Sequence, residues 1–287
     1  MRLITSEDSL RKFIPNVLQT VKGEVQLFDK LMSYLDIAEE WFSHTFTSEY
    51  MLNTIASYDD GNIIRTYSAK VIVGEAFKNA IPSLDLILTP NGFGIVNNSN
   101  IAPASGERVN RLIDSLEAER DNAIRLLLSA LAEDTEWKQT TQYGFFAATM
   151  FPNIDICDFL GIRNYKWQKY QEIRPDILDI EEYIVSQFIG TELMDVLRKE
   201  AMSPSSTSSY LMKTVIRSLR AYEAQVLKNK LSTPEPYVCS PPTALISIVN
   251  TIRTNPDEFP EWHASSIADL YKPVIYENKK GDKAYWF

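Results

Sequence analysis

The chain has 287 residues, of which 45% are hydrophobic and 23% are charged, and its formal net charge at pH 7 is −9. These values are ordinary for a globular protein of one or two domains, and the acidic balance argues against broad binding to DNA or RNA. The polar N-terminal stretch predicts no secretion signal, and no apolar run approaches the roughly 18 residues of a membrane-spanning helix. The two cysteines, Cys157 and Cys239, are consistent with a reducing compartment. We therefore expect synthesis in a cytoplasm and no membrane partner.

Residues 1–135 predict an N-terminal helical half. Apolar residues recur there at spacings of three and four, which places them on one face of each helix. Pro82 is expected to end the fourth helix, because proline has no N–H with which to continue the hydrogen-bond pattern. The predicted helices cover residues 5–16, 24–44, 47–57, 63–80 and 105–133.

Two β-prone runs flank the sequence "TPNG" and predict a β-hairpin near residues 84–97. Pro90 and Asn91 suit its turn, Gly92 permits a positive φ, and Phe93 opens the second run. The two closely spaced glycines also invite comparison with phosphate-binding loops. A Walker loop needs a Gly-Lys pair that this segment lacks, and the dinucleotide fingerprint needs glycine where Asn97 stands. The tip of a hairpin is therefore the favoured interpretation.

Residues 136–164 are rich in aromatic side chains and are expected to cross from one half of the molecule to the other. Residues 165–287 predict a C-terminal helical half, in which Pro175 lies near the start of a helix. A second β-hairpin is expected near residues 273–287, and we expect its aromatic end to be buried in the fold or against a neighbouring chain. That end consists of Tyr285, Trp286 and Phe287. The predicted helices of this half cover residues 165–189, 191–201, 209–231 and 244–253.

The two halves share a short internal similarity. The sequence "EEWFSHTFTSEYMLNTI" (39–55) aligns without gaps on "EEYIVSQFIGTELMDVL" (181–197), which pairs Phe46 with Phe188. The expected fold class is mainly α, with one or more helical bundles and two β-hairpins, and the similarity suggests an internal duplication of a three-helix unit. Chance similarity between two helices of the same period stays open as the alternative.

Few residues are spaced in a way that predicts chemistry. The two histidines, His44 and His263, form no metal-binding spacing with each other or with a cysteine, and no Gly-x-Ser-x-Gly nucleophile motif occurs. The adjacent carboxylates Glu39–Glu40 and Glu181–Glu182 point about 100° apart on a helix, which predicts solvated faces rather than acid–base pairs. We therefore predict no catalytic residue, no cofactor and no metal.

Three stretches carry a resemblance to a known family. The block "AFKNAIPSLDLILTPNGFGIVNNSNIAPASGERVNRLIDSL" (76–116), the opening "LITSEDSLRKFIPNV" and the ending "PVIYENKKGDKAYWF" resemble an uncharacterised family carried by phages and prophages of gut Bacteroidetes. The resemblance spans nearly the whole chain and implies a place among virion morphogenesis proteins near the head–tail junction. By analogy of fold, the helical halves also resemble phage head–tail connector (adaptor) proteins, which assemble as rings under the portal.

The resemblance leads us to expect a non-enzymatic head–tail connector or adaptor that joins the portal to the tail. Its expected partners are its own copies in a ring, the portal or tail proteins, and DNA that passes through the ring without sequence-specific binding. It would be located in the virion after assembly in the host cytoplasm. A tail terminator or completion protein, a soluble assembly factor and an enzyme are the alternatives. The candidate contact residues lie in the two hairpins: Pro90, Asn91, Gly92, Phe93, Tyr285, Trp286 and Phe287.

Overall fold

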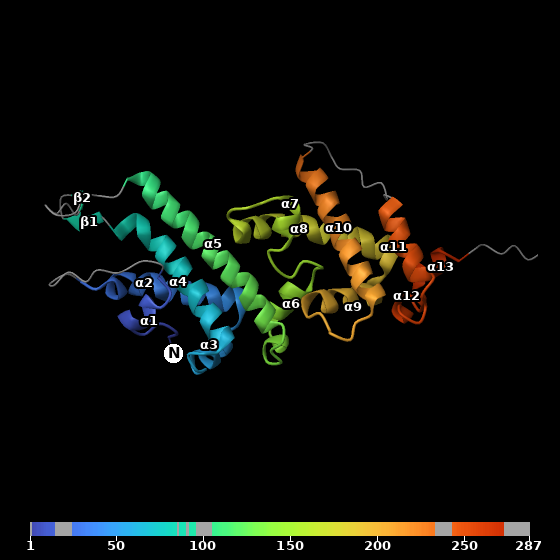
Figure 1. The fold of residues 1–287 in the computed structure, drawn as a ribbon, viewed down its shortest axis with the longest axis horizontal. Helices are drawn as coiled ribbons and strands as arrows, with labels where there is room; N and C mark the ends of the chain where they lie inside the picture. Colours follow the sequence, from blue (N-terminus) through green and yellow to red (C-terminus); the bar gives the residue numbers. More distant parts are fainter. Residues whose placement is uncertain are drawn as a thin grey trace, which may run out of the picture.

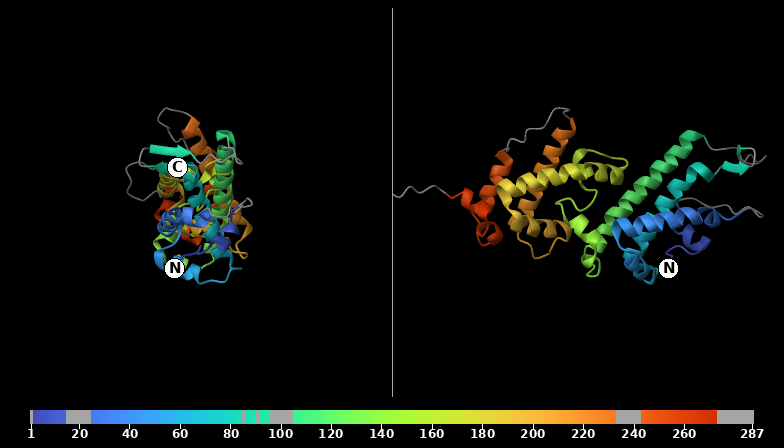
Figure 2. Two further views of the ribbon diagram at one scale, coloured as in Figure 1. Left: turned by 90° about the vertical axis from the view of Figure 1, so that its left-hand side faces the viewer. Right: turned by 180° about the vertical axis from the view of Figure 1, so that it is seen from behind.

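The computed structural model describes residues 2–14, 25–84, 86–89, 92–95, 105–232 and 243–272. The fold is mainly α-helical, which confirms the class predicted from the sequence. The molecule is elongated, and helices α1–α5 lie toward one end of its long axis while helices α8–α13 lie toward the other (Figures 1 and 2). We refer to residues 2–147 as the first unit and to residues 148–272 as the second unit.

The first unit is built around α4, which packs against both α2 and α5. Polar side chains begin its helices: the hydroxyl groups of Ser6 and Ser48 and the amide oxygen of Asn62 accept backbone N–H groups of the first turns of α1, α3 and α4. The elements of this unit are α1 (Glu7–Arg11), α2 (Leu27–Phe46), α3 (Glu49–Ala56), α4 (Ile63–Leu84), β1 (Leu86–Thr89), β2 (Gly92–Ile95), α5 (Gly106–Leu131), the 3₁₀ turn η1 (Trp137–Gln139) and α6 (Thr141–Ala147).

Helix α4 does not end before Pro82 but continues to Leu84, so the predicted end of this helix is wrong. The missing N–H of Pro82 removes one hydrogen bond of the last turn. Ala80 and Ile81 are buried in the same turn, and this burial keeps the turn helical despite the proline.

The two strands lie at the outer end of the α4–α5 pair (Figure 1). β1 pairs with β2 in antiparallel register, with Leu86 opposite Ile95 and Thr89 opposite Gly92. This pairing falls where the sequence predicts the first hairpin. The hairpin predicted near residues 273–287 lies outside the described residues.

The second unit repeats this packing, because α10 contacts both α8 and α11. Pro175 is the tenth residue of α8, so its predicted place near a helix start is wrong; Pro175 is exposed while Ile173 and Ile177 on either side of it are buried. The elements of this unit are α7 (Ile156–Leu160), α8 (Lys166–Ile184), the π-helical turn η2 (Val185–Ile189), α9 (Thr191–Met202), α10 (Tyr210–Ser232), α11 (Thr243–Arg253), α12 (Pro260–His263) and α13 (Ser266–Leu270).

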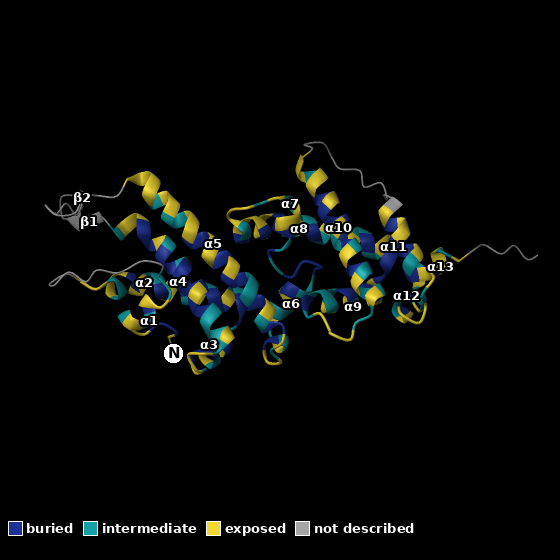
Figure 3. Ribbon diagram, viewed as in Figure 1, coloured by how far each residue is buried: buried dark blue, intermediate teal, exposed yellow. Residues whose placement is uncertain are grey.

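Helix α2 and the continuous α8–η2 helix occupy corresponding places in the two units. The gapless alignment of residues 39–55 on 181–197 extends backward along both helices, and α3 and α9 begin at aligned positions. Figure 3 shows buried residues on the inner faces of both units. Within α2 and the α8–η2 helix, the aligned residues that are buried in both units are Leu31 and Ile173, Leu35 and Ile177, Ala38 and Ile180, Phe42 and Ile184, and Phe46 and Phe188.

A buried tryptophan closes each of these helices in the same way. The indole Nε1 of Trp137 donates to the carbonyl oxygen of Phe46 at 2.7 Å, and that of Trp262 donates to the carbonyl oxygen of Phe188 at 2.8 Å. The last carbonyl groups of a helix lack partners within the helix, so the indole supplies one. We call these two contacts the tryptophan pins.

The tryptophan pins belong to a second gapless similarity between the two units. The sequence "EWKQTT" at residues 136–141 corresponds to "EWHASS" at residues 261–266. Thr140 precedes α6 and Ser265 precedes α13 at aligned positions. A similarity of six residues between two helical segments is too short to be recognised from the sequence alone. It becomes visible when the matching contacts of the two tryptophans are known.

Candidate functional site

Two of the seven candidate contact residues in the predicted hairpins lie in the described part of the chain. Gly92 and Phe93 lie in β2, opposite Thr89 and Leu88 of β1. The remaining candidates, Pro90, Asn91, Tyr285, Trp286 and Phe287, lie outside the described residues. Among the described residues, the best-defined contact region is the junction between the two units.

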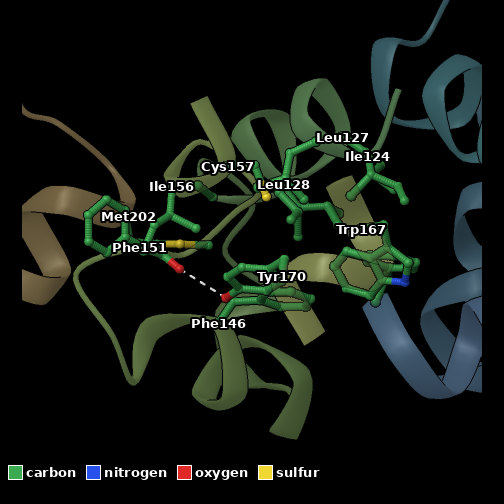
Figure 4. Close-up of a cluster of buried hydrophobic side chains, with 14 of the residues drawn as sticks. Ile124, Leu127, Leu128, Phe146, Phe151, Ile156, Cys157, Trp167, Tyr170 and Met202 are labelled. Carbon is green, nitrogen blue, oxygen red and sulfur yellow. Dashed lines mark hydrogen bonds between the residues drawn. The ribbon is translucent and has the colours of Figure 1, made fainter. Parts of the chain in front are cut away.

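The centre of the junction is a group of aromatic rings. The ring of Trp167, at the start of α8, lies 4.9 Å from the ring of Phe46 and 6.3 Å from the ring of Phe146, measured between centroids. Phe46 and Phe146 are themselves stacked at 5.9 Å. Side chains of α5, namely Ile124, Leu127 and Leu128, join the same buried cluster (Figure 4). Two units that share such a core are expected to behave as one rigid body.

Polar contacts fix the orientation of the second unit on the first. The backbone N–H of Trp167 donates to the carboxylate of Asp121 on α5, at 3.3 Å. The guanidinium group of Arg174 lies 3.5 Å from the ring centroid of Phe145 and donates to the carbonyl oxygen of that residue. A cavity of about 310 Å³ opens beside these contacts; the residues that line it come from the end of α2, from α6 and from α8. Helix α6 thus contacts both units, since it packs against α2 and α9.

A buried ion cluster links α4 and α5 within the first unit. The guanidinium group of Arg120 contacts the carboxylates of Glu75 and Asp121, and Lys78 contacts Glu75 and Glu117. Burial alone would lower the pKa of Arg120, but the two carboxylates raise it above its ordinary value. In the same way, Arg120 and Lys78 outweigh burial and lower the pKa of Glu75. Both cations are paired with carboxylates of α4 and α5, so the cluster is a structural brace that also anchors the Asp121 contact to the junction.

The second buried carboxylate group contradicts a prediction. Glu181 is fully buried, so its predicted place on a solvated face is wrong. Its carboxylate accepts the backbone N–H of Met150 at 2.7 Å and pairs with Arg198 at 2.8 Å. The aligned Glu39 of the first unit likewise accepts the backbone N–H of Leu3 at 2.9 Å. In both units this glutamate therefore secures the segment that precedes the first short helix.

Glu223 on α10 is the most unusual titratable group among the described residues. Its side chain is buried, and neither carboxylate oxygen has a hydrogen-bond partner. Burial raises the pKa of Glu223 well above its ordinary value, and the nearby charge of Glu181 raises it further. The guanidinium group of Arg220 opposes this effect only in part, and that group itself stacks over the ring of Phe151. Burial thus favours the protonated form of Glu223 in the folded chain.

The described residues offer little else that is typical of an active site. No group of three or more His, Cys, Asp or Glu side chains is arranged in that part of the chain to hold a metal ion. Burial raises the pKa of the Cys157 thiol to about 12, so this thiol is a packing group rather than a nucleophile. His263 contacts the ring of Trp262 edge-on and lies next to the carbonyl oxygen of Ile252. The helices of the described part of the chain do not combine the length and apolarity that crossing a bilayer requires.

Comparison with known families gives one similarity. Residues 14–147, slightly less than half of the 287-residue chain, match the model of a family of unknown function (DUF6712). Comparisons with curated proteins and with solved structures give no significant match. The matched segment ends at Ala147, which is also the last residue of α6 and of the first unit.

Proposed function

We propose that this chain is a non-enzymatic structural subunit of a phage virion, built from two copies of one helical unit. In this proposal it forms a ring at the head–tail junction and joins the portal to the tail. The observation that carries the proposal is the matched pair of helical units, fixed end to end through a buried junction. The sequence resemblance described above supplies the biological setting.

The duplication rests on contacts that recur at aligned positions. Each unit has a tryptophan pin, a glutamate that accepts a backbone N–H from the preceding segment, and the same order of packed helices. The family match covers the first unit only and stops at its end. A unit boundary near residue 147 agrees with all of these observations.

The hairpins are the proposed assembly arms. The β1–β2 hairpin lies at the outer end of the α4–α5 pair (Figure 1), and a two-stranded hairpin is marginally stable in water without a further surface or strand. A portal, a tail protein or a neighbouring subunit would supply that surface. The negative net charge of the chain is compatible with a ring that lets DNA pass, because an acidic lining does not bind phosphate.

Mass spectrometry of purified virions is the direct test of this function. We expect the protein in the particles, with cross-links to the portal if it is a connector. Cross-links to tail-tube proteins alone would instead support the tail terminator or completion protein. A protein that is absent from particles and strictly monomeric in native mass spectrometry would overturn the structural function and favour an assembly factor or an enzyme.

Removing part of each hairpin in turn tests which hairpin mediates assembly. Replacing residues 86–95 with a flexible Gly-Ser linker, and separately deleting residues 284–287, should leave the helical circular dichroism signal almost unchanged. The arm that mediates assembly is the one whose loss removes the protein from particles. If neither variant changes incorporation, the hairpins are not assembly arms.

A further inference from the structure

We propose that copies of this chain associate head to tail, and that the end of the second unit docks on the start of the first unit of the next copy. The occupant of each exposed end is thus a second copy of the same chain. The inference rests on the duplicated architecture proposed above but needs no assumption about the virion. The proposed contact between copies repeats the junction that joins the two units within one chain.

The junction uses one face of each unit. The first unit contributes Phe145 and Phe146 from α6, which meet Arg174 and Trp167 of α8. If the two units are copies, the second unit has a face that corresponds to α6, and the first unit has a face that corresponds to the start of α8. Neither of these two faces is used by the intramolecular junction.

The gapless alignments identify the residues on the two unused faces. Counting from the paired tryptophans, Phe145 and Phe146 correspond to Leu270 and Tyr271 at the end of the second unit. The ring of Tyr271 lies 5.8 Å from that of Trp262, just as the ring of Phe146 lies 6.2 Å from that of Trp137. This shared contact confirms the alignment at the end of each unit.

The other face follows from the alignment of α2 on α8. Trp167 and Arg174 correspond to Val25 and Met32 at the start of the first unit. Trp167 is 4% exposed in the junction, whereas Val25 is 62% exposed. Met32 is 37% exposed, while its counterpart Arg174 is held by Phe145. Five aligned pairs of α2 and the α8–η2 helix are buried in both units, so the two helices share most of an inner face while they differ at these junction positions.

The exposed positions are complementary in chemistry. A repeat of the intramolecular contacts between copies would place Leu270 against Met32 and Tyr271 against Val25. Leu270 is 70% exposed, and an apolar side chain of this size gains free energy when it is removed from water. The two faces lie toward opposite ends of the long axis (Figure 1), which is the arrangement that a head-to-tail contact requires. Such a contact closes into a ring if its rotation allows and otherwise extends into a filament.

Cysteine cross-linking between copies tests the contact. Met32→Cys and Leu270→Cys are introduced separately and together into the full chain, with Cys239→Ser to remove a native thiol, and are treated with a short bis-maleimide. A mixture of the two single variants should give cross-linked dimers, the double variant should give a ladder of oligomers, and each single variant alone should stay uncross-linked. Ile37→Cys, at another exposed position of α2, is the matched control and should not cross-link to Leu270→Cys.

Substitution of an exposed residue gives a second measurement. Leu270→Asp should weaken self-association about tenfold or more in analytical ultracentrifugation without changing the melting temperature, because the side chain is exposed within one chain. Dimers from a single cysteine variant would indicate a symmetric contact and overturn the proposal. Cross-linking of the Ile37→Cys pair as strong as that of the Met32→Cys pair would also overturn it. Presence in virions without this cross-link would leave the proposed function standing and remove only the head-to-tail contact.

Discussion

Glu223 illustrates how a single buried side chain can govern the pH dependence of stability. Its pKa is raised in the folded chain by burial and by Glu181, whereas in the unfolded chain it returns to about the ordinary value of 4.5. As the pH rises above 4.5, the unfolded chain gives up this proton and the folded chain keeps it. The folded state therefore loses stability by up to about 1.4 kcal/mol per pH unit until its own raised pKa is reached.

Glu223→Gln should remove this loss. We expect the free energy of unfolding of the variant, measured by urea denaturation between pH 5 and pH 7, to fall less steeply with pH than that of the native chain, by up to about 1.4 kcal/mol per pH unit. The exposed Glu182→Gln is the control and should stay within about 0.5 kcal/mol of the native chain at each pH. Parallel pH profiles for the native chain and Glu223→Gln would contradict a raised pKa of Glu223.

The buried glutamates could not be predicted from the sequence, because burial of a carboxylate depends on partners that lie far away along the chain. Glu182 is exposed and Glu181 is fully buried, and the difference comes from Arg198 and the backbone N–H of Met150, 17 and 31 residues away. One signal was nevertheless present. The alignment of Glu39 on Glu181 paired two residues whose shared role is to accept a backbone N–H.

At the scale of the helix, the tryptophan pins define where α2 and η2 end. Trp137→Phe and Trp262→Phe each remove the indole donor and leave a buried carbonyl group without that partner. We expect each variant to lose about 1–3 kcal/mol in the free energy of unfolding, and the two losses to be similar. Chemical denaturation of both variants measures this. A large loss in one variant and none in the other would argue against equivalent pins.

Pro175 lies inside α8, where it lacks the N–H that would bond to the carbonyl oxygen of Gln171. Pro175→Ala restores this hydrogen bond at an exposed position. A proline in the interior of a helix destabilises the folded state by about 3 kcal/mol, whereas its stiffening of the unfolded chain stabilises the protein by at most about 1 kcal/mol. The variant should therefore be about 2 kcal/mol more stable. Thermal denaturation followed by circular dichroism would show this as a higher melting temperature. A lower melting temperature would mean that α8 needs the bend that proline allows.

Most helices could be predicted from periodicity, because long amphipathic patterns reflect burial on one face. Helix α9 at Thr191–Met202 and α10 at Tyr210–Ser232 lie within one residue of the predicted bounds. The predictions at Pro82 and Pro175 were wrong, because the packing of α4 and α8 outweighed the local preference of proline. The short helices α6 and α7 could not be predicted, because 7 and 5 residues are too few to show a helical period.

At the scale of the whole molecule, the junction determines whether the two units unfold together. Phe146 is buried and its ring contacts Phe46, Trp137 and Trp167, so it connects both units. Phe146→Ala should cost about 3–5 kcal/mol and divide a single calorimetric transition into two. Tyr50→Ala, at a residue that is 76% exposed, should change neither stability nor the number of transitions. A single transition of unchanged width in Phe146→Ala would show that other contacts couple the units.

The buried tryptophans also give the chain a set of internal optical reporters. Trp137 lies in the first unit, Trp262 in the second, and Trp167 at the junction, and all three side chains are almost fully removed from solvent. Indole emission shifts to longer wavelength when water reaches the ring, so each of these residues reports on the opening of a different region. Variants that keep one of these three and replace the other four of the five tryptophans would resolve, without any added label, whether an end of the molecule loosens before the junction does.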